Sequence, residues 1–128
     1  YIKTKEIEYK TAVNMAKTEI LPAVVKQINA VASAAAAAKS AGMASKALTE
    51  DIKKFDTFYS NIRHCTDKLE EALAKADKQE NHHKKAEFLA DAAEKALGKL
   101  REAVDHAEEV VAQEFWPMAK YQELLTEL

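Results

Sequence analysis

The chain has few of the residues that interrupt helices. Its 128 residues include 2 glycines and 2 prolines. All-β and βα folds need frequent turns, which glycine and proline normally supply, so this scarcity argues against both classes. The single cysteine, Cys65, cannot form an intrachain disulfide, and this fits a reducing compartment such as the cytoplasm.

The chain also lacks an excess of either charge. Its 19 basic and 21 acidic residues leave a formal net charge of −2, without the basic footprint of a nucleic-acid-binding protein. No stretch approaches the ~20 apolar residues that span a bilayer, and no signal-peptide pattern is present. We therefore expect a cytoplasmic protein without nucleic-acid or membrane partners. Because the chain begins at Tyr1 rather than Met, we expect it to be part of a longer protein.

Helix-forming residues dominate what is present. A first helix is predicted from about residue 2 to about residue 38, because apolar residues recur at helical spacing. Pro22 interrupts this stripe, so we expect a kink near Thr18–Pro22, with a break into two helices as the alternative. Gly42 is the most favourable residue for ending this helix, and the connection to the next helix is predicted over Lys39–Leu48. The stripe comprises Tyr9, Val13, Ala16, Ile20, Ala23, Ile28, Val31 and Ala35.

Two further long helices follow. The second is predicted from about residue 49 to about residue 78, with Thr49 as N-cap. The third runs from about residue 84 to about residue 115, after a connection near Lys78–His83, and its Gly98 suggests a close helix approach. The second carries a heptad stripe of Ile52, Phe55, Tyr59, Ile62, Thr66, Leu69, Leu73 and Ala76. The third carries Leu89, Ala93, Ala96, Leu100, Val104, Ala107 and Val111.

These patterns predict an all-α fold, an elongated antiparallel three-helix bundle formed as a single helical domain over residues 1–128. The chain should turn at Trp116-Pro117, because proline disfavours helix in the residue before it and suits the first turn of a new helix. A short last helix over about residues 117–127 should then dock on the body through Trp116 and its own apolar residues.

No catalytic, cofactor-binding or metal-binding residue is predicted. Glu80-Asn81-His82-His83 holds one Glu-x-x-His, whereas di-iron bundles need two, so we interpret His82 and His83 as solvated turn residues. His106 is interpreted as a salt-linked surface residue and Cys65 as a half-buried, unreactive thiol. Phe55, Phe58 and Tyr59 are interpreted as core residues, with a surface for a partner protein as the alternative reading.

Both ends of the chain carry a resemblance to one family. The segments that carry it are Tyr1-Ile2-Lys3-Thr4-Lys5-Glu6-Ile7-Glu8, Asn14-Met15-Ala16-Lys17-Thr18-Glu19-Ile20-Leu21-Pro22-Ala23-Val24, Leu100-Arg101-Glu102-Ala103-Val104-Asp105, Phe115-Trp116-Pro117-Met118 and Tyr121-Gln122-Glu123-Leu124-Leu125. They resemble the C-terminal helical region of type III glutamine synthetase. The middle, about Ala30 to Glu87, is similar only in being helical, and Ala119-Lys120 departs from the Leu-Pro-Thr expected there.

The resemblance implies a non-catalytic structural and oligomerisation module. The parent enzyme would be a glutamate–ammonia ligase that uses ATP and a divalent metal such as Mg²⁺ and assembles as a dodecamer of two stacked rings. Its ATP, metal and glutamate residues would lie before Tyr1, so no cofactor is expected in this segment. The partners implied are the parent catalytic domain and neighbouring subunits. The alternative is a free-standing helical adaptor that binds partner helices, and a metal-binding four-helix enzyme is a third reading.

Overall fold

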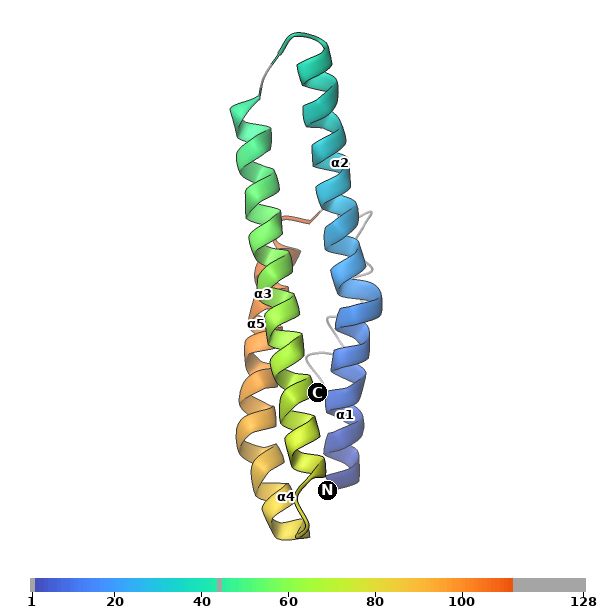
Figure 1. Ribbon diagram of the computed structural model, residues 1–128, viewed down its shortest axis with the longest axis vertical. Helices are drawn as coiled ribbons and strands as arrows, with labels where there is room; N and C mark the ends of the chain where they lie inside the picture. Colours follow the sequence, from blue (N-terminus) through green and yellow to red (C-terminus); the bar gives the residue numbers. More distant parts are fainter. Residues whose placement is uncertain (1, 44, 112–128) are drawn as a thin grey trace.

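Three long helical rods make up the body of the protein in a computed structural model that describes residues 2–43 and 45–111 (Figure 1). The first rod is α1 (Ile2–Met15), η1 (Ala16–Ile20) and α2 (Leu21–Ser40). The second is α3 (Lys46–Asp77), and the third is α4 (His82–Phe88), η2 (Leu89–Ala93) and α5 (Glu94–Glu108). Successive rods run in opposite directions, so the predicted all-α antiparallel bundle is confirmed. The predicted helix after Trp116-Pro117 lies outside the described residues.

The first rod passes through Pro22 without ending. Pro22 has no N–H to donate and would clash with the carbonyl four residues earlier in a regular α-helix. The chain meets this constraint with the π-helical turn η1 directly before the proline, where the Leu21 N–H reaches back five residues to the Ala16 carbonyl. The rod therefore remains continuous to Ser40, as the kink prediction required. Gly42 follows at φ 81° and closes the helix end, with the Met43 N–H donating to the Ala38 carbonyl at 2.8 Å.

The predicted N-cap of the second rod was wrong. Helix α3 begins at Lys46, and Ser45 is its N-cap, with the Ser45 hydroxyl accepting from the Leu48 N–H at 3.2 Å. Serine caps helices at least as well as threonine and stands one turn earlier in the chain. Thr49 instead donates its hydroxyl to the Ser45 carbonyl from inside the first turn, at 3.2 Å.

The bounds of the third rod also differ from the prediction. The rod begins at His82, because Asn81 caps it by accepting from the backbone N–H groups of His83 and Lys84. It ends at Glu108 rather than near residue 115, and a turn follows in which the N–H groups of Val110 and Val111 both reach the Ala107 carbonyl. Two adjacent β-branched valines favour helix poorly, which accounts for the early end.

The core lies along α3. Its heptad residues Ile62, Leu69, Leu73 and Ala76 are buried, and both other rods pack against them. Thr66 is the buried polar member of this stripe, and its hydroxyl is satisfied by the Ile62 carbonyl at 2.7 Å. Each fully buried aliphatic side chain contributes about 1.5–3 kcal/mol relative to exposure. The first rod contributes Tyr9, Ala12, Val13, Met15, Ala16, Ile20, Leu21, Ala23 and Val24, and the third rod with the turn after it contributes Leu89, Ala93, Leu97, Leu100, Val104, Ala107 and Val111.

Polar contacts join the first and third rods near the lower end of the body in Figure 1. The fully buried Tyr9 donates its hydroxyl to Glu94 Oε2 at 2.5 Å and lies 3.4 Å from the Leu89 carbonyl oxygen. Lys85 Nζ lies 2.5 Å from Glu6 Oε1, and this hydrogen bond raises the pKa of the Lys85 ammonium. The Tyr9 contact falls on η2, a π-helical turn with no proline to cause it.

Gly98 does not mark a close helix approach. It is exposed, and a Cβ placed there would meet no atom within 4 Å. The expectation of a packing contact at this residue was therefore wrong.

The expectation that no segment is apolar enough to span a membrane also needs correction. The helix over Lys3–Ser40 is long and apolar enough to do so, by length and composition only. Its apolar character comes largely from the alanine-rich stretch 30–38. A core helix of a soluble protein and a signal sequence both meet the same criterion, so this property assigns no membrane.

Replacing Tyr9 with phenylalanine should destabilise the body by about 1 kcal/mol, because Glu94 loses its donor at a site removed from water. The matched control is Tyr59→Phe, since the half-buried Tyr59 hydroxyl bonds to no described residue. Urea unfolding followed by circular dichroism measures both. Equal stability of the two variants would show that the Tyr9 hydroxyl contributes nothing.

The two glycines should respond to alanine in opposite directions. Gly98→Ala should stabilise the protein by about 0.5–1 kcal/mol, because alanine suits an open helix interior better than glycine. Gly42→Ala should destabilise it by about 1 kcal/mol, because the positive φ at Gly42 strains any L side chain. Thermal unfolding of both variants tests the pair, and a loss of stability for Gly98→Ala would contradict the open environment.

Candidate functional site

The histidines do not converge. His64 lies on α3, His106 on α5, and His82 and His83 in the first turn of α4. His83 Nε2 lies 3.0 Å from Glu87 Oε1, with both side chains largely exposed, so the Glu-x-x-His sequence around residue 80 forms a surface pair with a different glutamate. Within residues 2–43 and 45–111, no group of three or more His, Cys, Asp or Glu side chains is placed to hold a metal ion.

The aromatic residues of α3 mainly pack inward. Phe55 is 7% exposed, and Phe58 and Tyr59 are half-buried against the core. This agrees with the interpretation of these residues as core and leaves little aromatic surface for a partner. Tyr59 also borders a shallow hollow beside Leu21 and Pro22 of the first rod.

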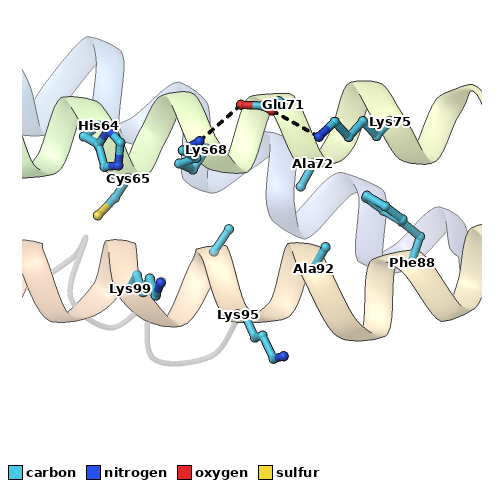
Figure 2. Close-up of a pocket in the computed structure, with 11 residues that line it drawn as sticks. His64, Cys65, Lys68, Glu71, Ala72, Lys75, Phe88, Ala92, Lys95 and Lys99 are labelled. Carbon is cyan, nitrogen blue, oxygen red and sulfur yellow. Dashed lines mark ion pairs between the residues drawn. The ribbon is translucent and has the colours of Figure 1, made fainter.

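A deeper hollow among the described residues lies between α3 and the third rod, and we call it the lysine groove (Figure 2). Its volume is about 390 Å³, within the range of small-ligand sites. In Figure 2, Cys65 and Ala72 point from α3 toward the third rod, and Phe88 and Ala92 point back toward α3. The lining residues are His64, Cys65, Lys68, Glu71, Ala72, Lys75, Phe88, Ala92, Lys95, Ala96 and Lys99.

Small side chains form the floor of the lysine groove because α3 and the third rod approach each other through alanines. Ala72 faces Ala92 across the gap, and Phe88 occupies one end (Figure 2). Long side chains at the neighbouring helical positions form the rim, where their charged ends reach water. The groove therefore has an apolar floor and a charged rim.

The rim of the lysine groove is positive. Four lysines oppose one glutamate among its lining residues. Glu71 lies 3.7 Å from Lys68 and 3.1 Å from Lys75, and the hydrogen bond to Lys75 lowers the pKa of the Glu71 carboxyl. Lys95 pairs with Asp91 at 3.1 Å. Lys99 has no ion pair to another described residue, so it is the rim cation most available to an anionic group.

Cys65 lies in the lysine groove, where it is half-buried as predicted. Burial raises the pKa of its thiol, the positive charge of Lys99 opposes that rise, and the negative charge of Glu102 adds to it. The thiolate is the reactive form, so the raised pKa makes Cys65 a poor nucleophile at neutral pH. This environment is the reverse of the one that activates a catalytic cysteine.

The arrangement suits binding. The lysine groove provides an apolar floor and a cationic rim. His64 also lines the groove beside Cys65, and among the described residues no hydrogen bond joins the two side chains. Sequence reasoning noticed Cys65 but missed the groove. The only sequence feature that indicates the groove is alanine at positions 72, 92 and 96. Alanine is common in helices for its helix propensity alone, so these positions did not predict a groove.

Charge substitutions beside Cys65 should change its reactivity in opposite directions. Lys99→Glu should raise the thiol pKa further and slow alkylation by iodoacetamide several-fold at pH 8. Glu102→Gln should lower the pKa and accelerate alkylation. Rates measured from pH 7 to pH 10 in the folded protein give both pKa values, and a Lys99→Glu protein that reacts as fast as the parent would place Lys99 away from the thiol.

No protein-family model, curated protein or solved structure matches this chain. The resemblance to type III glutamine synthetase therefore depends on the residues quoted for it and stays a prediction.

Proposed function

We propose that this chain is a structural and assembly module, the C-terminal helical region of a type III glutamine synthetase. The observation that carries the proposal is the burial of the motif residues near Pro22. Ile20, Leu21, Ala23 and Val24 are all 8% exposed or less, in the part of the first rod that packs on α3, while Pro22 is exposed. The motif residues thus serve packing, as residues of a structural module would.

The parent protein would join ammonia to glutamate at the expense of ATP with Mg²⁺, in the cytoplasm. The residues for that reaction would lie before Tyr1, and we assign no catalytic or cofactor-binding role to any residue of this segment. In this proposal the parent catalytic domain and neighbouring subunits are its partners, and it contributes to the assembly of the homo-oligomer.

The shape of the body supports an assembly role. The upper parts of α2 and α3 extend beyond the end of α5 as a two-helix arm (Figure 1). Along the arm, Ile28, Val31 and Ala35 of α2 are only partly buried, and Val25 and Met43 are 48% and 69% exposed. In a two-helix arm, each helix covers only one side of the other, so the remaining faces of the arm are open to neighbouring subunits. The lysine groove offers these subunits a second surface.

A free-standing adaptor is the second candidate, and the lysine groove favours it. An apolar floor with a cationic rim suits the acidic amphipathic helix of a partner protein. The coding sequence directly upstream of Tyr1 separates the two functions. A glutamine synthetase catalytic region there supports the first, and an unrelated domain or a start codon leaves the adaptor.

Unfolding the module inside its parent should disrupt assembly. Deleting the segment equivalent to residues 1–128, or replacing the fully buried Leu69 with aspartate, should dissociate the oligomer and reduce ligase activity, because a buried charge without a partner prevents packing. Light scattering with size-exclusion chromatography and an activity assay measure both effects.

The control for this experiment is Asp67→Asn, at an exposed position of the same helix, which should leave assembly intact. Unchanged assembly, stability and activity after the deletion would contradict a structural role.

A further inference from the structure

The lysine groove has two chemically different ends. Phe88 occupies one end, whereas Cys65 and Lys99 lie together at the other (Figure 2). Phe88 and Lys99 are eleven residues apart on the third rod, which is about 16 Å along a helix. A molecule that follows the groove is therefore long and narrow, with an aromatic ring at one end of it and an ammonium group at the other.

The floor of the lysine groove is apolar and partly open. Ala72 is 7% exposed, and Phe88, Ala92 and Ala96 are half-buried against the core. Covering the remaining apolar surface with another apolar group removes both from water, which is favourable. The floor therefore suits an apolar body and places no hydrogen-bonding demand on it.

The rim leaves one cation for an anionic ligand. Glu71 pairs with two of the four rim lysines, and Asp91 pairs with a third, Lys95. Lys99, the fourth, has no ion pair to another described residue. A partner helix with a row of carboxylates would compete with the existing pairs, whereas a ligand with a single negative charge needs only Lys99.

One carboxylate lies near the same end of the groove. The charges of Lys99 and Glu102 shift the pKa of the Cys65 thiol in opposite directions, so both side chains lie within electrostatic reach of this thiol. Glu102 follows Lys99 by three residues on α5, and no ion pair joins the two. An anion at Lys99 is therefore attracted by one neighbouring charge and repelled by the other, and these two effects can be separated by substitution.

We propose that the lysine groove binds a small monocarboxylic acid with a narrow apolar body, of which a medium-chain fatty acid is the simplest example. The carboxylate pairs with Lys99, and the apolar body lies over Ala72 and Ala92 toward Phe88. The groove volume of about 390 Å³ lies within the range of small-ligand sites. The proposal is independent of the function proposed above, since it depends only on the residues that line the groove.

Cys65 reports on the ligand without any labelling, because it lies in the groove and is the single cysteine of the chain. Dodecanoate, below the concentration at which it forms micelles, should slow the alkylation of Cys65 by iodoacetamide several-fold at saturation. Dodecyltrimethylammonium has the same tail and the opposite charge, and it should not protect the thiol. The absence of protection by dodecanoate, or equal protection by both compounds, would overturn the proposal.

The length of the apolar body should also matter. Octanoate carries the same carboxylate but covers less of the floor, so half-maximal protection should need an octanoate concentration at least about tenfold higher than that of dodecanoate. Phe88→Ala should weaken protection by dodecanoate and leave protection by octanoate unchanged, because the shorter chain stops before Phe88. Equal effects on both acids would contradict the proposed direction of the ligand.

Charge substitutions test the position of the carboxylate. Lys99→Gln should raise the dodecanoate concentration for half-maximal protection several-fold, and Glu102→Gln should lower it. Half-maximal concentrations are compared within each variant, because both substitutions also change the intrinsic reactivity of the thiol. Lys10→Gln is the matched control, since Lys10 is exposed on α1 and does not line the groove. Lys99→Gln and Lys10→Gln proteins that bind equally well would contradict the proposal.

Filling the floor tests the position of the apolar body. Ala92→Leu should abolish protection by dodecanoate, while the far-ultraviolet circular dichroism stays the same. If this substitution unfolds the protein, the Phe88→Ala and Lys99→Gln measurements decide. Unaltered protection in a folded Ala92→Leu protein would place the apolar body outside the groove.

A partner protein is the competing occupant. A synthetic acidic amphipathic helix that protects Cys65, under conditions in which dodecanoate does not, would assign the lysine groove to a protein ligand and overturn the proposal. The sequence upstream of Tyr1, which tests the proposed function, has no bearing on this outcome.

Discussion

The rest of the body depends on the apolar stripe of α3, because this helix alone packs along its length on both other rods. Ile62 and Leu69 at its centre are 0% exposed. The first and third rods make few contacts with each other, so without α3 neither would have a partner for its buried side. Thr66 lies within the stripe without penalty, since its hydroxyl bonds inside its own helix. This dependence explains why the heptad of α3 was the clearest pattern in the sequence.

Apolar stripes determine which sides of two helices pack together, but they allow one helix to shift along the axis of the other at little cost. The polar contacts fix the position of the helices along that axis. The Tyr9 hydroxyl meets Glu94 and the edge of η2, and Lys85 meets Glu6 and also Asp77 at 3.5 Å. These contacts join the first rod to the third near one end, where the chain also turns from α3 into α4. A buried tyrosine hydroxyl tolerates little displacement, because losing its acceptor in a dry site is costly. The two parallel rods are thus held level at this end of the body.

The parts of the fold that follow from local chemistry could be predicted, and the parts that follow from the rotation of one helix against another could not. Heptad spacing predicted the buried side of α3, and Pro22 predicted the irregular turn before it. The start of α3 was misplaced because Ser45 and Thr49 are both good caps and the sequence does not rank them. The π-helical turn η2 contains no proline or glycine from which it could have been predicted. The lysine groove depends on how α3 and α5 face each other, and its alanines and lysines are ordinary helix residues.

Several charged residues of this protein pair with one another. Glu71 holds two rim lysines, Glu6 holds Lys85, and Glu70 holds Lys17. Burial raises the pKa of the Cys65 thiol, which makes it a weaker nucleophile at neutral pH. Lys99 and Arg101, two residues apart on α5, have no ion pair to another described residue and lie on different sides of that helix. The Nε and Nη2 atoms of Arg101 are out of contact with solvent, whereas Lys99 is exposed on the rim of the lysine groove.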